Sequence, residues 1–133
     1  MKNIGLVLIV MVFSVFGCKS PKEAVAELQS GKYDIVSING EEIDDKAQVD
    51  INFNTKASRV TGSAGCNKYT ASYTVENGML EVKKAAVTKM SCMFMSIETQ
   101  FLKALSQVKS YKYKEDMILL LDENKNVILK GKK

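Results

Sequence analysis

Hydrophobic and polar residues alternate along most of the chain from residue 31 onward. In residues 48–53, Val49, Ile51 and Phe53 fall on one face and polar residues on the other. This period of two is typical of a β-strand with one buried face and one solvent-exposed face. Similar runs predict about eight short strands, at residues 32–38, 48–53, 57–63, 69–75, 79–82, 111–113, 117–121 and 127–129, with a further one at 85–90.

The connections between these runs carry turn signals. Asn39-Gly40 and Asn77-Gly78 each follow a predicted strand, and Asn-Gly is the strongest short-range signal of a β-hairpin. Residues 62–69 (GSAGCNKY) place two glycines, a cysteine and an asparagine between two strands. Such a composition indicates a tight connection with unusual backbone demands.

The hydrophobic period changes only once, in residues 97–108. The apolar residues there recur every three or four positions and form one stripe: Ile97, Phe101, Ala104, Leu105 and Val108. This spacing predicts an amphipathic helix. A lone helix in a sheet protein packs across the sheet or fills the open end of a half-barrel. The predicted fold class is therefore α+β, a curved, half-barrel-like antiparallel β-sheet with one amphipathic helix packed against it.

The first residues follow neither pattern. A short basic start precedes an apolar run at residues 4–16, which is too short to span a bilayer. The run ends in Val15-Phe16-Gly17-Cys18, which resembles the lipobox of bacterial lipoprotein signal peptides. This resemblance implies cleavage before Cys18 and attachment of acyl chains, including palmitate, to that cysteine. The alternatives are an ordinary secretory signal peptide and a buried core helix.

The lipobox implies a domain order and a location. Residues 1–17 would be the signal peptide, residues 18–30 a lipidated tether, and residues 31–133 the folded domain. Several acyl chains together give stable membrane anchoring. Lys19 stands where an aspartate would retain a lipoprotein in the inner membrane, so we expect an outer-membrane lipoprotein of a Gram-negative envelope. The sequence leaves open whether the domain faces the periplasm or the cell exterior.

Composition and charge narrow the function classes. With 133 residues, 46% hydrophobic and 26% charged, the chain has the composition of one globular domain. Removing the signal peptide leaves 18 basic and 15 acidic residues, about +3, because Lys2 is one of the 19 basic residues. These charges are interspersed, and no basic block is interleaved with aromatic residues, which gives nucleic-acid binding little support.

Because Cys18 would be acylated after processing, two cysteines are left with free thiols, Cys66 and Cys92. In an oxidising compartment they are expected to form a disulfide, although free buried thiols are the alternative. A third hypothesis is a Cu(I) site, because residues 90–95 hold Met90, Met93 and Met95 beside Cys92. Methionines near the start of a helix are, however, commonly core filler. No metal or cofactor is therefore predicted.

Catalysis has little support in the sequence. The chain contains no histidine, so a serine or cysteine nucleophile would lack its usual base. A cysteine held in a disulfide cannot act as a nucleophile. Glu98, in the first turn of the predicted helix, is interpreted as a capping or dipole-satisfying residue, and Asn67 as a residue that holds a turn with its side chain. The prediction is that the protein is not an enzyme.

With these motifs placed, residues 31–129 resemble the META domain, or HslJ-like, family of bacterial envelope proteins. The resemblance is carried by residues 37–40, 62–69, 88–92 and 98–105. It implies that the motif residues carry the fold and its bridge, and these residues are Gly62, Gly65, Asn67, Tyr69, Thr88, Met90 and Glu98. The family is associated with envelope stress and heat-shock responses. No catalytic activity is established for it, so the resemblance gives no reason to expect an enzyme.

Three functions are consistent with the sequence. The first is a non-enzymatic, membrane-anchored binding or scaffolding module in envelope stress tolerance, whose partner is an envelope protein. The second is a carrier or sensor of an apolar small ligand or lipid, which a cavity beneath Ile97, Phe101 and Leu105 would favour. The third is Cu(I) binding by the Met and Cys loop.

Overall fold

The computed structural model describes residues 25–133 and contains ten strands, one α-helix and one 3-10 helix. The strands are β1 (Gly31–Ile38), β2 (Glu41–Glu42), β3 (Asp50–Asn54), β4 (Arg59–Ser63), β5 (Lys68–Glu76), β6 (Met79–Val82), β7 (Ala86–Val87), β8 (Ser110–Lys114), β9 (Met117–Leu121) and β10 (Val127–Lys132). The helices are η1 (Asp45–Ala47) and α1 (Met95–Gln107). The predicted signal peptide and Cys18 lie outside the described residues.

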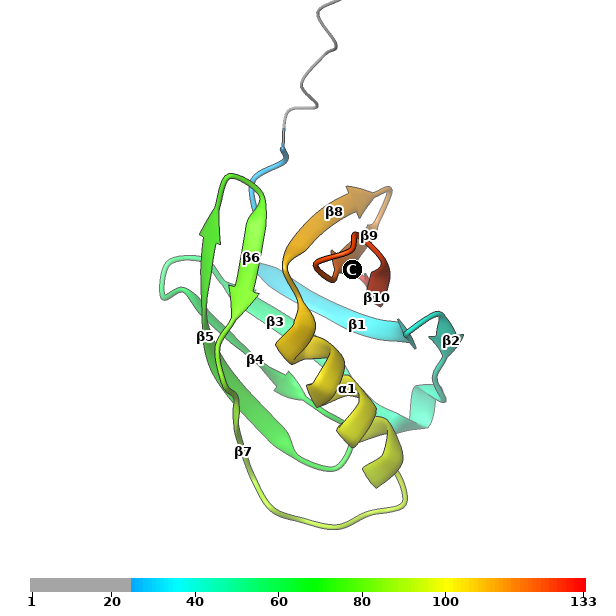
Figure 1. Cartoon of the computed structure of the whole chain (residues 1–133). Helices are drawn as coiled ribbons and strands as arrows, with labels where there is room; N and C mark the ends of the chain where they lie inside the picture. Colours follow the sequence, from blue (N-terminus) through cyan, green and yellow to red (C-terminus); the bar gives the residue numbers. More distant parts are fainter. Residues whose placement is uncertain (1–24) are drawn as a thin grey trace, which may run out of the picture.

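Eight of the strands form a closed antiparallel ring. Its order is β10, β9, β8, β6, β5, β4, β3 and β1, and β1 pairs again with β10 (Figure 1). The short strands β2 and β7 pair with β1 and β5 respectively and lie off the ring. The predicted α+β class is confirmed, and the half-barrel is closed by the β1–β10 pairing, which brings the two ends of the domain together.

Both Asn-Gly pairs form the predicted hairpin turns. Asn39 and Gly40 have φ values of 50° and 86°, and Asn77 and Gly78 have φ values of 50° and 79°. Positive φ at both central residues is the geometry that matches the twist of the flanking strands. These turns connect β1 to β2 and β5 to β6, and they fix the register of each pair.

Several predicted boundaries were wrong. The strand predicted at 57–63 begins at Arg59, because residues 55–58 form a turn in which Ser58 has φ 49°. The strand predicted at 85–90 is confined to Ala86–Val87. The strand predicted to begin at residue 48 begins at Asp50, because Gln48 is the left-handed C-cap of η1. Neither η1 nor β2 was predicted from the sequence.

The helix α1 covers the interior of the ring, as its apolar stripe predicted. Phe101, Ala104 and Leu105 are buried, and α1 contacts β1, β6 and β10 (Figure 1). The ring of Phe101 packs on Tyr69 of β5, with centroids 5.4 Å apart. This packing explains why the hydrophobic period changes from two to about 3.6 only in this segment. Among residues 25–133, no helix is long and apolar enough to cross a membrane.

The ring has one weak joint, which we call the seam. Strands β6 and β8 share a single residue pair, Met79 with Ser110, supported by a hydrogen bond from the Leu80 N–H to the Lys109 carbonyl oxygen at 2.9 Å. Every other neighbouring pair in the ring shares at least three residue pairs. The sheet therefore separates most easily between β6 and β8.

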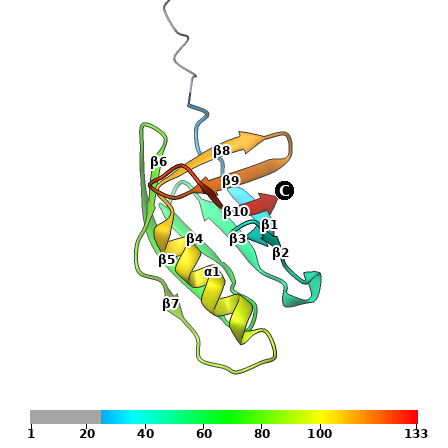
Figure 2. The ribbon, with the colours of Figure 1, turned by 45° about the vertical axis from the view of Figure 1, so that its right-hand side comes forward.

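Residues 25–30, which we call the strap, cover the seam (Figure 2). The Tyr111 hydroxyl donates a hydrogen bond to the Ala26 carbonyl oxygen at 2.9 Å. The Gln29 N–H donates to the Tyr113 hydroxyl at 3.0 Å. Leu28 is only 6% exposed and belongs to the hydrophobic core. The folded domain therefore includes Leu28, which lies three positions before Gly31 and was predicted to belong to the tether.

Candidate functional site

The motif residues of the two cysteine loops meet at the start of α1. The predicted disulfide is present and joins Cys66 to Cys92, whose Cα atoms are 5.6 Å apart. Around it lies a hydrogen-bonded group that we call the clasp: Cys66, Asn67, Thr88, Met90, Cys92 and Glu98. The clasp connects the β4–β5 connection to a distant part of the chain, namely the β7–α1 loop and the helix that directly follows this loop.

Glu98 is the acceptor at the centre of the clasp. Its side chain is buried, with 5% of the residue exposed. Its Oε2 accepts hydrogen bonds from the N–H groups of Cys66 at 3.1 Å and Asn67 at 2.7 Å. Its Oε1 accepts a third from Asn67 Nδ2 at 2.8 Å. Glu98 does not cap α1, because these bonds commit its carboxylate to another loop and give the buried group its partners. It does lie in the first turn of α1, as the alternative interpretation of a dipole-satisfying residue requires.

Asn67 uses every polar group of its side chain. Its Oδ1 accepts hydrogen bonds from the Met90 N–H at 2.7 Å and the Thr88 hydroxyl at 3.0 Å. Its Nδ2 donates to the Met90 carbonyl oxygen at 2.9 Å as well as to Glu98. The interpretation of Asn67 as the holder of a local turn was therefore wrong. Asn67 pairs with the main chain of Met90 as a strand neighbour would, and it fastens the β7–α1 loop to β5.

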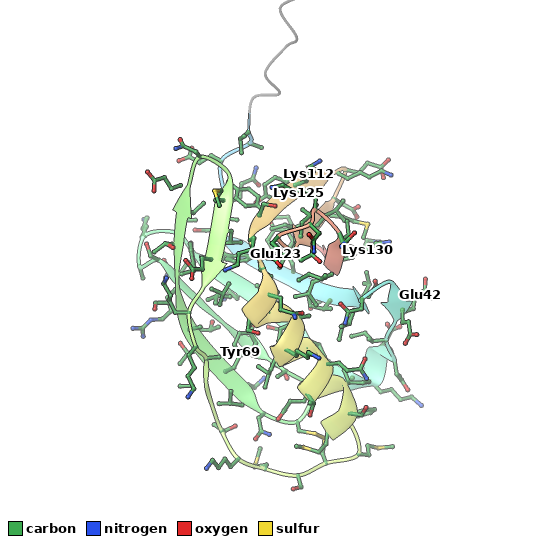
Figure 3. All side chains as sticks on the ribbon, viewed as in Figure 1. Glu42, Tyr69, Lys112, Glu123, Lys125 and Lys130 are labelled. Atoms are coloured by element: carbon green, nitrogen blue, oxygen red, sulfur yellow. A yellow bond between two sulfur atoms is a disulfide. The ribbon has the colours of Figure 1, made fainter. Side chains whose placement is uncertain are left out.

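The three remaining motif residues shape the backbone beside the clasp. A Cβ at Gly62 would overlap the carbonyl oxygen of Asp50, so only glycine allows β3 and β4 to approach this closely. The Tyr69 hydroxyl donates to the same oxygen at 3.0 Å. Gly65 has φ +119°, a conformation that other residues rarely adopt. Tyr69 lies between β5 and α1 (Figure 3), and burial raises its pKa well above the usual range.

The chemistry available to the clasp is limited by its own bonds. The two sulfurs are bonded to each other, so neither is a thiolate. The carboxylate of Glu98 and the amide of Asn67 are occupied by protein partners. Of the soft ligands considered for Cu(I), only the exposed methionines remain, with Met93 87% and Met90 64% exposed. Among residues 25–133, no group of three or more His, Cys, Asp or Glu side chains is arranged to hold a metal ion.

A second cluster of side chains, which was not predicted from the sequence, lies at the opposite end of the ring. We call it the tyrosine cluster: Tyr33 of β1, Tyr73 of β5, and Tyr111 and Tyr113 of β8. The rings of Tyr111 and Tyr113 lie 5.9 Å apart. The alternating positions predicted buried tyrosines, but no sequence signal showed that strands so far apart bring their hydroxyl groups together.

Burial keeps the phenols of Tyr33, Tyr73 and Tyr111 protonated. It raises the pKa of Tyr33, with a further contribution from the Tyr113 hydroxyl. It raises the pKa of Tyr73 in the same way, with smaller contributions from Tyr113 and Tyr111. The pKa of Tyr111 is raised by burial and by Tyr113. At neutral pH these hydroxyls are therefore neutral hydrogen-bond donors.

Two surface grooves border the strap above the tyrosine cluster. One has a volume of about 520 Å³ and includes Leu28, Tyr73 and Tyr111 in its lining. The other has a volume of about 640 Å³ and lies between Met79 on one side and Lys112 on the other. Both volumes fall in the range of about 300–1,000 Å³ that is typical of small-molecule sites. Neither groove is lined by α1, whose Phe101 and Leu105 are fully buried. The structure therefore gives no support to a cavity beneath the helix, which would have favoured a carrier of an apolar ligand.

Solved structures of other proteins share the fold of this chain. The sequence model of the META domain family matches residues 26–133. A DUF4847 family protein from Bacteroides vulgatus is 17% identical, with a TM-score of 0.61, and the match covers 77% of this chain and 92% of that protein. A protein from Burkholderia xenovorans is 20% identical, with a TM-score of 0.60 and coverage of 86% and 97%. No curated protein matches the sequence. At these identities the solved structures establish the fold alone.

Proposed function

The chain belongs to the META domain family, and from this premise we propose that it is a lipid-anchored, non-enzymatic module of the outer membrane that binds or scaffolds envelope proteins under stress. The observation that carries the proposal is the clasp. Its two cysteines are bonded and its polar side chains hydrogen-bond one another. Motif residues with this arrangement are suited to fixing a fold rather than to acting on a substrate.

The disulfide also supports the proposed location in the bacterial envelope. Structural disulfides are common in the periplasm and at the cell surface and rare in the cytosol. The lipobox-like segment ending at Cys18 supplies the anchor, and Lys19 favours sorting to the outer membrane. The part in stress tolerance is proposed from the family, whose members are associated with envelope stress responses.

The location is tested by fractionating a Gram-negative host that expresses the full chain. We expect the wild-type protein in the outer-membrane fraction, with a mass that includes acyl chains on Cys18. Cys18→Ser should lose the acyl mass and leave the outer membrane, because no thioether can form. The matched control is Lys19→Asp, which keeps the lipid and should move the protein to the inner membrane.

Two outcomes would contradict the location. One is a wild-type protein that carries no acyl mass. The other is a Cys18→Ser variant that fractionates with the outer membrane as the wild type does. In either case the anchoring would have to come from another part of the chain.

A second candidate function is binding of an apolar or amphiphilic small ligand. The observation that favours it is the tyrosine cluster beneath the strap, where two buried hydroxyls have no partner among residues 25–133. The helix–sheet interface is filled by Phe101 and Leu105, so this candidate applies to the seam. It is compatible with the scaffolding role, because the two sites lie at opposite ends of the ring.

A further inference from the structure

The positive charge of the described chain is concentrated in its last three strands. Residues 109–133, which include β8, β9 and β10, contain seven lysines and four acidic residues. Residues 25–108 contain nine basic and ten acidic residues. The C-terminal strands are therefore basic, whereas the remainder of the described chain is close to neutral.

The register of these strands gathers their lysines on one side of the sheet. Two residues of β9 each pair with a lysine of β8 and a lysine of β10. The resulting rows are Lys112, Leu119 and Lys130, and Lys114, Met117 and Lys132. Residues directly opposite one another in an antiparallel sheet share a face. We call these six residues the basic face.

The basic face lies on the outside of the ring. Ile118 and Leu120 alternate with Met117 and Leu119 along β9, and the first two are fully buried. Met117 and Leu119 are half-buried between the two sets of lysines. The face therefore presents four ammonium groups around a small apolar centre.

The lysines of the basic face are available to a partner. Among residues 25–133, only Lys132 of the four forms an ion pair, and its Nζ lies 3.8 Å from Asp116 Oδ2. Both side chains are more than half exposed, so this pair contributes little. Asp34, which pairs with Lys132 on β1, forms an ion pair with Lys32 at 3.0 Å. The other acidic residues of this segment lie in the connections between the strands.

The composition of the basic face favours a lipid surface over a nucleic acid. All four charges are lysines, which act as point charges, whereas arginine is the residue suited to bidentate contacts with a phosphate. None of its six residues is aromatic, so it offers no ring on which a base could stack. Lysines around a small apolar centre suit a bilayer, where ammonium groups meet anionic headgroups and apolar atoms lie toward the acyl chains.

The basic face also lies beside the point at which the described chain begins. Val25 and Lys112 line the same groove of about 640 Å³, and Figure 1 and Figure 2 both show the strap entering beside β8. Lys112 and Lys130 lie over the strands β8 and β10 (Figure 3). Val25 comes seven residues after Cys18, and a segment of that length spans at most about 25 Å. A membrane that holds acyl chains on Cys18 is therefore within reach of the basic face.

We propose that the basic face docks the domain on the anionic phospholipid headgroups of the membrane that holds its anchor. This inference rests on the proposed lipid anchoring and adds an orientation to it, with the outer face of β8, β9 and β10 against the bilayer. The anchor keeps the headgroups at a high local concentration, so a weak electrostatic contact is sufficient. The lysines supply most of the attraction, and Met117 and Leu119 supply the remainder.

The test is the binding of the chain from Ser20 to lipid vesicles, measured by cosedimentation. This chain retains every residue that the structure describes and lacks Cys18, so any binding comes from the domain itself. We expect saturable binding to vesicles of phosphatidylcholine and phosphatidylglycerol in equal parts. Binding to phosphatidylcholine alone should be weaker by about tenfold or more. Added salt should weaken the binding to the anionic vesicles, because it screens exposed charges.

A charge-matched pair of variants tests the assignment to the basic face. The first variant replaces its four lysines: Lys112→Gln, Lys114→Gln, Lys130→Gln and Lys132→Gln. The second replaces four exposed lysines elsewhere: Lys46→Gln, Lys56→Gln, Lys84→Gln and Lys103→Gln. The first should bind anionic vesicles about a hundredfold more weakly, because each lysine near an anionic surface contributes about fivefold. The second should lose less than about fivefold, because its charges lie away from the contact.

Thermal unfolding without vesicles establishes that both variants are folded. The proposal is overturned if the chain from Ser20 binds anionic vesicles no better than neutral ones. It is also overturned if the two variants lose affinity equally, because net charge would then account for the binding. Binding of duplex DNA as tight as that of anionic vesicles in the same buffer would overturn the assignment to lipid. Cys18 takes no part in these measurements, so a failure of docking and a failure of anchoring are distinguishable.

Discussion

Replacing Glu98 by alanine is expected to reduce the free energy of unfolding by about 3–5 kcal/mol. The buried carboxylate accepts three hydrogen bonds, from the Cys66 and Asn67 N–H groups and from Asn67 Nδ2. Alanine would leave the two N–H groups without their acceptor and Asn67 Nδ2 with the Met90 carbonyl oxygen alone. A domain of this size has a total stability of about 5–15 kcal/mol, so this loss is a large share of the whole.

The measurement is urea-induced unfolding of the oxidised protein, followed by circular dichroism. Gln100→Ala is the matched control, because Gln100 is an exposed residue on the same helix, and within residues 25–133 its side chain hydrogen-bonds only to the Ser96 side chain. The control should change stability by no more than about 0.5 kcal/mol. A Glu98→Ala variant as stable as this control would show that the clasp does not hold α1 to the sheet.

Replacing both Cys66 and Cys92 by serine is expected to reduce the free energy of unfolding by about 3–4 kcal/mol. The bridge spans a sequence separation of 26 residues, and its loss gives the unfolded chain more conformations. The variant should still fold at room temperature, because the Asn67 and Glu98 hydrogen bonds join the same two loops.

Chemical reduction of the wild-type protein supplies the control. The reduced wild type and the double serine variant should unfold at the same urea concentration, well below that of the oxidised protein. If the serine variant is as stable as the oxidised wild type, the bridge contributes nothing to stability. If reduction unfolds the protein while the serine variant stays folded, the free thiols rather than the lost bridge cause the damage.

The sequence predicted those features that depend on short stretches of chain. The alternation in residues 48–53 placed Val49, Ile51 and Phe53 on the buried face, and all three are at most 2% exposed. The two Asn-Gly turns and the stripe of α1 were predicted for the same reason, because their signals lie within a few residues. The pairing of Cys66 with Cys92 was predicted because the expected acylation of Cys18 leaves only these two cysteines able to pair.

Features that depend on long-range contacts could not be predicted in the same way. Glu98 in a first helical turn resembles a dipole-satisfying residue, and only the fold shows that it binds residues 66 and 67. Closure of the ring depends on β1 meeting β10 and on a seam of one residue pair. The tyrosine cluster draws on β1, β5 and β8, which alternation alone cannot bring together.

The most direct test of the structural role of the clasp is a double-mutant cycle between Asn67→Ala and Glu98→Ala. Unfolding would be measured on the oxidised protein in a stabilising osmolyte, so that each variant remains folded. Because the two side chains hydrogen-bond each other and share one network, we expect a coupling energy of about 1–3 kcal/mol. The parallel cycle of Asn67→Ala with Gln100→Ala should be additive within about 0.5 kcal/mol. Additive losses for Asn67 and Glu98 as well would contradict a clasp that acts as one unit.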